Sequence, residues 1–158
     1  MSAELIVALD VPSSREIPPI LERLPQVTWF KIGLEIFTSE GPAVITLLSK
    51  RGKKVFLDLK LHDIPRTVAR AVTSACGHGV NMMTVHASGA REMLEAAAEA
   101  ARKIADSPKL VAVTTLTSLD EKGILEIGIT RPLAEHTIQL GKMAVSAGMD
   151  GLVCSPRE

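Results

Sequence analysis

Two acidic residues and a lysine that could do acid-base chemistry lie within six consecutive positions of the chain. Asp58, Lys60 and Asp63 belong to the segment KVFLDLKLHD, in which apolar and polar residues alternate. In a strand, this alternation places the side chains of Asp58 and Lys60 on one face. Buried charges are costly unless they are paired, so the cluster has little structural purpose. A lysine held between two carboxylates can remain protonated and deliver a proton to carbon.

Further polar residues stand where other apolar segments end, at Asp10, Lys31, His86 and Thr117. In a parallel barrel, ligands collect at the C-terminal ends of the strands, which makes each residue a candidate for substrate binding. Each also has an ordinary structural explanation. An aspartate after a strand often forms a turn or a helix N-cap, and a lone lysine usually extends to solvent. His86 fits a capping or core histidine equally well, and helix capping accounts for Thr117 or its neighbour Ser118.

The elements that would position these residues follow a repeated pattern of short β-branched runs and longer runs rich in Ala, Leu and Glu. This pattern indicates βα units and a parallel sheet. Proline and glycine residues separate the runs, as at Gly41 and Pro42. The predicted strands are 4–10, 27–35, 54–60, 80–86, 110–115 and 151–155, and the predicted helices are 14–24, 40–51, 65–78, 89–105 and 131–147.

These elements predict an α/β fold, the TIM (β/α)8 barrel, of which the chain holds about the first six strands and five helices. Strand starts lie about 30 residues apart, so eight units would need about 240 residues. The chain has 158 residues, and we expect residues 1–158 to form a single incomplete barrel domain with two open sheet edges. A fragment of a longer enzyme is the favoured interpretation, and half of a split enzyme or a degraded copy are alternatives.

Composition excludes several other classes of function. Lys plus Arg and Asp plus Glu are both 18, so no basic field attracts nucleic acid or an anionic membrane. The chain has three Phe, one Trp and no Tyr, which leaves no stacking platform for single-stranded nucleic acid. No apolar run or leader pattern indicates membrane insertion or export, and Cys76 and Cys154 lack metal-like spacing. We therefore expect a cytosolic protein that acts on a small molecule.

The central segment resembles a known signature. Asp58-Leu59-Lys60-Leu61-His62-Asp63, followed by Ile64-Pro65 and Thr67, is similar to the DxKxxD motif of the orotidine 5′-monophosphate decarboxylases of the class I bacterial type. The other strand ends agree with this family in the same order, which makes the resemblance cover nearly the whole chain. These segments are ALD (8–10), FKIG (30–33), TVHA (84–87), VTTLTS (113–118) and DGLVCS (150–155).

The resemblance implies a cofactor-free, metal-free homodimer of the cytoplasm that converts orotidine 5′-monophosphate to uridine monophosphate. It implies that Lys60 donates a proton to the carbon that loses carbon dioxide, that Asp58 shares its charge network, and that Asp63 reaches the neighbouring subunit's site. Each active site would then need two chains. The further substrate-binding residues that it implies are Asp10 and Lys31 near the ribose, Ile64 and Thr67 after the signature, His86, and Thr117 at the pyrimidine end.

Two alternatives remain open on the sequence. Magnesium-dependent sugar-phosphate decarboxylases and aldolases of the same superfamily also carry a DxKxxD strand, although Lys31 and the LTS segment after the fifth strand favour the nucleotide enzyme. An inactive truncated barrel that binds a partner or a nucleotide is the second alternative. The family pattern continues with a seventh strand, a phosphate-binding loop and an eighth strand with an arginine, none of which falls within the 158 residues.

Overall fold

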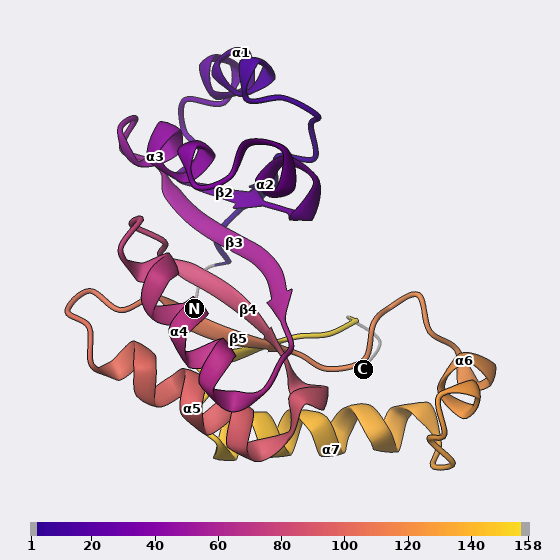
Figure 1. Ribbon diagram of the computed structural model, residues 1–158. Coiled ribbons are helices and arrows are strands. Elements are labelled where there is room, and N and C mark those ends of the chain that lie inside the picture. Colours follow the sequence, from indigo (N-terminus) through magenta and orange to yellow (C-terminus); the bar gives the residue numbers. More distant parts are fainter. Residues whose placement is uncertain (1–2, 156–158) are drawn as a thin grey trace.

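The computed structural model describes residues 3–155, which form one parallel sheet with helices along it (Figure 1). The strands are hydrogen-bonded in chain order, and every neighbouring pair is parallel. Each connection therefore returns the chain to the next position in the sheet and brings all C-terminal strand ends to one side. The strands are β1 (Ile6–Ala8), β2 (Trp29–Ile32), β3 (Lys54–Leu61), β4 (Met82–His86), β5 (Lys109–Val113) and β6 (Gly151–Val153).

Helices occupy each connection between the strands. In Figure 1, α4, α5 and α7 lie on one side of β3 to β5, and α6 stands at the far end of the loop after β5. None of the helices within residues 3–155 is long and apolar enough to cross a membrane. The helices are η1 (Ser14–Glu16), α1 (Ile17–Arg23), α2 (Leu34–Glu40), α3 (Ala43–Ser49), α4 (Pro65–Cys76), η2 (Ala87–Gly89), α5 (Ala90–Arg102), α6 (Glu121–Glu126) and α7 (Leu133–Ser146), where η marks a 3-10 turn.

The six predicted strands and their parallel order are confirmed, and each predicted helix contains an observed one. The prediction missed two short helices. Gly33 ends β2 and begins α2, where a strand to residue 35 was predicted, and Gly41, with φ of 63°, ends α2 before Pro42 opens α3. The second missed helix, α6, has only six residues and begins where the Asp120 side chain accepts a hydrogen bond from the Gly123 N–H. Helices this short leave little periodicity to detect.

The apolar face of β3 anchors this strand against the helices. Val55 and Leu57 are fully buried, and Leu59 and Leu61 line the same apolar cavity as residues of α4. That helix in turn buries Val68, Val72 and Ala75 on its inner face. Because strand side chains alternate, the opposite face of β3 turns toward the inside of the curved sheet. The polar residues Asp58 and Lys60 are therefore displayed there by a well-packed strand.

The sheet is open within the described residues, as predicted. β1 and β6 each pair on one side only, and so form its two edges. Apolar side chains remain exposed beside them, among them Leu5 before β1 and Leu152 and Val153 in β6. The chain thus carries unsatisfied strand edges and apolar surface of the kind that another strand or helix would cover.

The turn between β4 and α5 is sterically demanding at two adjacent residues. A Cβ atom on Gly89 would collide with the buried Met93 side chain and approach the His62 ring to 3.3 Å. The next residue, Ala90, has φ of 66° and ψ of 174°, a backbone region that is almost restricted to glycine. Glycine therefore suits both positions, position 89 because of the limited space and position 90 because of the backbone conformation.

This turn predicts opposite effects for two neighbouring substitutions. Gly89→Ala should lower the free energy of unfolding by about 1–3 kcal/mol, because the added methyl group overpacks the core at Met93. Ala90→Gly should raise it by about 1 kcal/mol, because the strain of the positive φ is removed. Urea denaturation of both variants measures the changes. A stabilising Gly89→Ala or a clearly destabilising Ala90→Gly would contradict the steric origin given to these effects.

Candidate active site

An irregularity in the pairing of β3 with β4 builds the centre of the site. Leu57 pairs with Met83 and Leu61 with Val85, so three residues of β3 lie opposite the single residue Thr84 of β4. Within this bulge, Lys60 has φ of 51°, in the left-handed region that costs a non-glycine residue about 1–3 kcal/mol. Such strain persists only where the surroundings hold the backbone in place, and it is frequent at functional sites.

Thr84 supplies the contacts that the bulge removes from the strand ladder. Its hydroxyl accepts a hydrogen bond from the Lys60 backbone N–H at 2.7 Å and donates one to Asp58 Oδ1 at 3.0 Å. The side chain is buried, with 1% exposed surface. Backbone and side chain of the bulge are therefore joined through one hydroxyl of the neighbouring strand.

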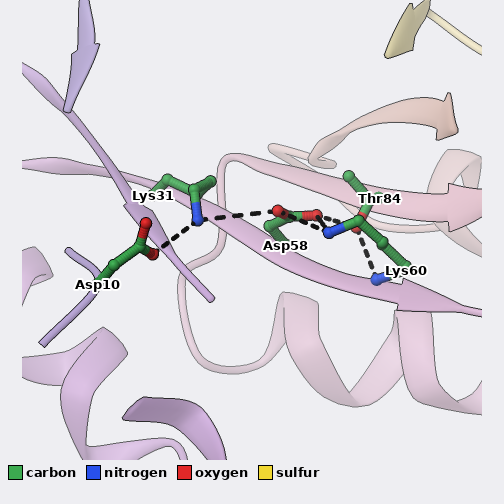
Figure 2. Close-up of polar contacts among 5 residues, drawn as sticks. All are labelled: Asp10, Lys31, Asp58, Lys60 and Thr84. Carbon is green, nitrogen blue, oxygen red and sulfur yellow. Dashed lines mark hydrogen bonds and ion pairs between the residues drawn. The ribbon is translucent and has the colours of Figure 1, made fainter. Parts of the chain in front are cut away.

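Four charged side chains from three adjacent strands form a continuous row (Figure 2). The Lys60 ammonium donates to both Asp58 oxygens at 2.9 and 3.0 Å. Lys31 Nζ, in β2, lies 3.8 Å from Asp58 Oδ2 and 3.1 Å from Asp10 Oδ1, just after β1. Exposure is lowest in the middle of the row, at 15% for the Asp58 side chain and 22% for Lys31, and higher at its two ends, at 33% for Lys60 and 68% for Asp10. The signs alternate, so each charge lies beside a charge of opposite sign.

Glycine makes room for one end of this row. A Cβ atom on Gly33 would lie 3.2 Å from Lys31 Nζ and 3.4 Å from Asp10 Oδ1. The backbone there is extended, so the need for glycine at this position comes from the space that the ion pair occupies. Gly33 also lies between the end of β2 and the start of α2, so the ion pair lies at the C-terminal end of β2.

Asp63 does not join the charged row within the described part of the chain, which differs from the expectation that Lys60 lies between Asp58 and Asp63. The Asp63 carboxylate is exposed and accepts a hydrogen bond from the Ile64 N–H. The lysine that does lie between two carboxylates is Lys31. The physical reason is the turn after β3, which directs residues 62–64 outward before Pro65 opens α4.

Ile64 and Thr67 lie on the same outward turn and the first turn of α4. Ile64 has 66% exposed surface, and Thr67 is also exposed. An apolar side chain this exposed, beside an exposed carboxylate at the C-terminal side of the sheet, is open to a ligand or to a second protein surface.

His86 ends β4 as predicted, and its ring stacks on that of His62. The ring centroids are 5.3 Å apart with an interplanar angle of 21°. His86 Nδ1 lies 2.6 Å from the Ser88 hydroxyl and accepts a weaker hydrogen bond from the Ser88 N–H. Burial lowers the pKa of His86, and the charges of His62 and Lys60 lower it further. The capping interpretation thus has support, since His86 caps the turn η2.

Thr117 lies in the loop after β5, with an exposed side chain. No hydrogen bond links it to the charged row among residues 3–155, so its predicted role at the pyrimidine end stays a prediction. The alternative that Thr117 or Ser118 caps a helix is wrong for α6, because Asp120 provides that cap.

The sequence prediction missed Thr84 as a site residue. It treats this threonine only as part of the TVHA segment, and periodicity assigns it to a buried strand. Its importance depends on the bulge that sets it opposite Asp58 and Lys60. β3 contains no glycine or proline that could have indicated this register shift in the sequence.

Comparisons with known proteins agree on one family. The family model described as "Orotidine 5'-phosphate decarboxylase / HUMPS family" matches residues 3–158. The orotidine 5'-phosphate decarboxylases of Nostoc sp. and Opitutus terrae are 45% and 46% identical to the chain, over 98% and 100% of its length. These alignments cover 68% and 69% of the relatives' own lengths, so the chain spans about two thirds of them.

Solved structures give the same result for the fold. The crystal structure of orotidine 5'-phosphate decarboxylase from Lactobacillus acidophilus matches with a TM-score of 0.91 and 39% identity. It covers 99% of this chain, and the chain covers 73% of it. The six curled parallel strands are therefore part of a TIM barrel, as predicted from the βα pattern.

The half-buried side chain of His86 predicts a pH dependence of stability. His86 has a pKa below its ordinary value of 6.5, so the unfolded chain binds the proton more tightly. The contribution of neutral His86 to the free energy of unfolding is complete above about pH 6.5 and is lost as the pH falls below this value. Burial and the charge of Arg131 also lower the pKa of His136.

We expect His86→Asn, whose side-chain oxygen can replace Nδ1, to flatten this dependence. Urea midpoints of the wild type and the variant at pH 7.5 and 5.5 provide the measurement. The wild type should lose more stability than His86→Asn between the two pH values. Equal losses in both proteins would contradict the assignment to His86.

Proposed function

Because the chain belongs to the orotidine 5'-phosphate decarboxylase / HUMPS family, we propose that it carries out the carboxy-lyase reaction of its curated relatives, the decarboxylation of orotidine 5′-phosphate in pyrimidine biosynthesis. The observation that carries this proposal is the ion pair of Lys60 with Asp58 at the end of β3, continued by Lys31 and Asp10. A lysine and a carboxylate side by side match a reaction in which carbon loses a carboxylate and gains a proton.

In the proposed step, the bond between the pyrimidine carbon and its carboxylate breaks, and carbon dioxide leaves. The electron pair stays on the ring carbon, where the Lys60 ammonium stabilises it and then donates a proton to form the new C–H bond. The neutral amine of Lys60 regains a proton from solvent. Since the charges of the row are already in place before the reaction, little reorganisation is needed as the negative charge develops.

Asp58 has two functions in this proposal. It holds the Lys60 ammonium through both carboxylate oxygens, which limits the positions that the proton donor can occupy. It also places negative charge near the carboxylate of the bound substrate, which disfavours the ground state relative to the transition state. Binding energy from the distant phosphate would offset this repulsion.

The other predicted site residues are assigned to substrate binding. We assign Lys31 and Asp10 to the ribose and its surroundings, in line with their position at the ends of β2 and β1. The remaining proposed contacts are Ile64 before α4, Thr67 in the first turn of α4, His86 at the end of β4, and Thr117 in the loop after β5.

A homodimer with shared sites is part of the proposal. Asp63 and Ile64 are exposed, and within residues 3–155 Asp63 forms no ion pair with the charged row, which suits a contact with the row of a second chain. A cytoplasmic location is also proposed. The free cysteines Cys76 and Cys154 fit a reducing compartment of this kind.

The magnesium-dependent sugar-phosphate enzymes are less compatible with the observed geometry. A divalent cation would need free carboxylate oxygens. The Asp58 oxygens instead accept hydrogen bonds from Lys60 and Thr84, and Asp10 is paired with Lys31. Lysines occupy the position next to these carboxylates that a cation would require.

The direct test of this function is turnover of orotidine 5′-phosphate by the full-length protein, with and without a chelator. Turnover should be unaffected by the chelator, and Lys60→Ala should reduce kcat by about 10²- to 10⁴-fold because the proton donor is lost. Lys109→Ala, an exposed lysine at the start of β5, is the matched control and should retain full activity. A requirement for magnesium, or more than a few per cent of activity in Lys60→Ala, would refute the proposal.

Sharing of sites predicts complementation between two inactive variants. Asp63→Ala and Lys60→Ala dimers should each have very low activity, whereas mixed dimers should regain activity because one of their two sites carries both residues. Mixing the separately purified variants and following product formation after subunit exchange tests this. If exchange is demonstrated but activity does not return, Asp63 does not act across the subunit boundary.

A further inference from the structure

Thr84 occupies a position that the proposed mechanism does not yet use. It is the residue of β4 that lies opposite the bulge of β3, and its hydroxyl contacts both the backbone of Lys60 and the carboxylate of Asp58. Resting on the function proposed above, we propose that Thr84 is a positioning residue of the reaction. Its hydroxyl fixes the proton donor and its counter-ion relative to each other (Figure 2).

The direction of the two hydrogen bonds follows from the donors and acceptors present. The Lys60 N–H can only donate, so Thr84 Oγ1 accepts at 2.7 Å. The single hydroxyl proton of Thr84 is then free for the Asp58 carboxylate, which can only accept, at 3.0 Å. The chain of bonds therefore runs in one direction, from the Lys60 amide through Thr84 to Asp58.

The backbone of Lys60 needs this contact because the bulge interrupts the ladder between β3 and β4. Between the pairs Leu57–Met83 and Leu61–Val85, the strands are out of register, and Lys60 adopts the left-handed φ of 51°. A threonine side chain takes the place of the strand acceptor. The strained conformation of Lys60 is thereby tied to a buried residue of a central strand.

The Asp58 carboxylate needs the contact for a different reason. Its other neighbours are the long side chains of Lys60 and Lys31, which are flexible and partly exposed. Thr84 is short, β-branched and buried, so it has the fewest alternative positions among these neighbours. It is the rigid reference to which the carboxylate, and through it the ammonium, is held.

Two substitutions separate the hydroxyl from the shape of the side chain. Thr84→Val keeps the branched shape but leaves the Lys60 N–H without its acceptor and removes the donor to Asp58. Thr84→Ser keeps the hydroxyl and loses only a methyl group. Thr137→Val is the matched control, because Thr137 is likewise buried and hydrogen-bonded, to the Thr115 hydroxyl, but lies on α7 away from the charged row.

The experiment measures kcat and KM for orotidine 5′-phosphate with these three variants of the full-length protein, together with their melting temperatures. Thr84→Val should lower kcat by about 10- to 100-fold, because small displacements of a catalytic group have effects of this size. Its KM should change less than about threefold, because the remote contacts to the substrate remain. Thr84→Ser should restore most of kcat, and Thr137→Val should lower the melting temperature without this loss of kcat.

Amide hydrogen exchange of Lys60 provides a second readout that does not depend on catalysis. Thr84→Val should accelerate this exchange, and Thr84→Ser should keep it slow. A Thr84→Val variant with wild-type kcat, a Thr84→Ser variant as impaired as Thr84→Val, or an unchanged Lys60 exchange rate would each overturn the proposal. A wild-type protein that fails to turn over the substrate would overturn the proposed function, and Lys60 exchange would still decide whether the hydroxyl holds the strained backbone.

Discussion

The contact between Asp58 and Lys60 is the interaction on which the rest of the site depends. A carboxylate and an ammonium two residues apart in a regular strand share a face, but here a bulge and a left-handed residue bring them into direct contact at 2.9 Å. The same carboxylate faces Lys31 of the neighbouring strand, which in turn pairs with Asp10. Without Asp58, Lys31 of β2 and Lys60 of β3 would lie near each other with no negative charge between them.

The scaffold explains how this arrangement is maintained. β3 buries Val55 and Leu57 against the helices, so the strand cannot rotate to expose its charges differently. β4 contributes Thr84 on one side, and β2 contributes Lys31 on the other. Because a parallel sheet brings the C-terminal ends of successive strands together, residues far apart in the sequence become neighbours in the row. The strain at Lys60 is offset by the core on which the three strands are packed.

Much of this could be predicted from the sequence, because it depends on periodicity. Alternation along KVFLDLKLHD places Asp58 and Lys60 on the polar face of the strand. The repeated βα units predict the parallel strand order, and this order places Asp10 and Lys31 beside them. What could not be predicted depends on local geometry. The bulge that gives Thr84 its position arises from the pairing of two strands, and the turn at Asp63 and the six-residue helix α6 are too short to leave a period in the sequence.

The proposed mechanism requires the charged row to hold the Lys60 ammonium where the reacting pyrimidine carbon lies. A crystal structure of the full-length protein with uridine monophosphate, the product of the proposed reaction, would test this requirement. We expect Lys60 Nζ to lie within contact distance of the carbon that has lost its carboxylate, still paired with Asp58, and Asp10 and Lys31 to lie at the ribose. A pyrimidine bound away from Lys60, or a row rearranged so that Asp58 no longer holds this lysine, would contradict the mechanism.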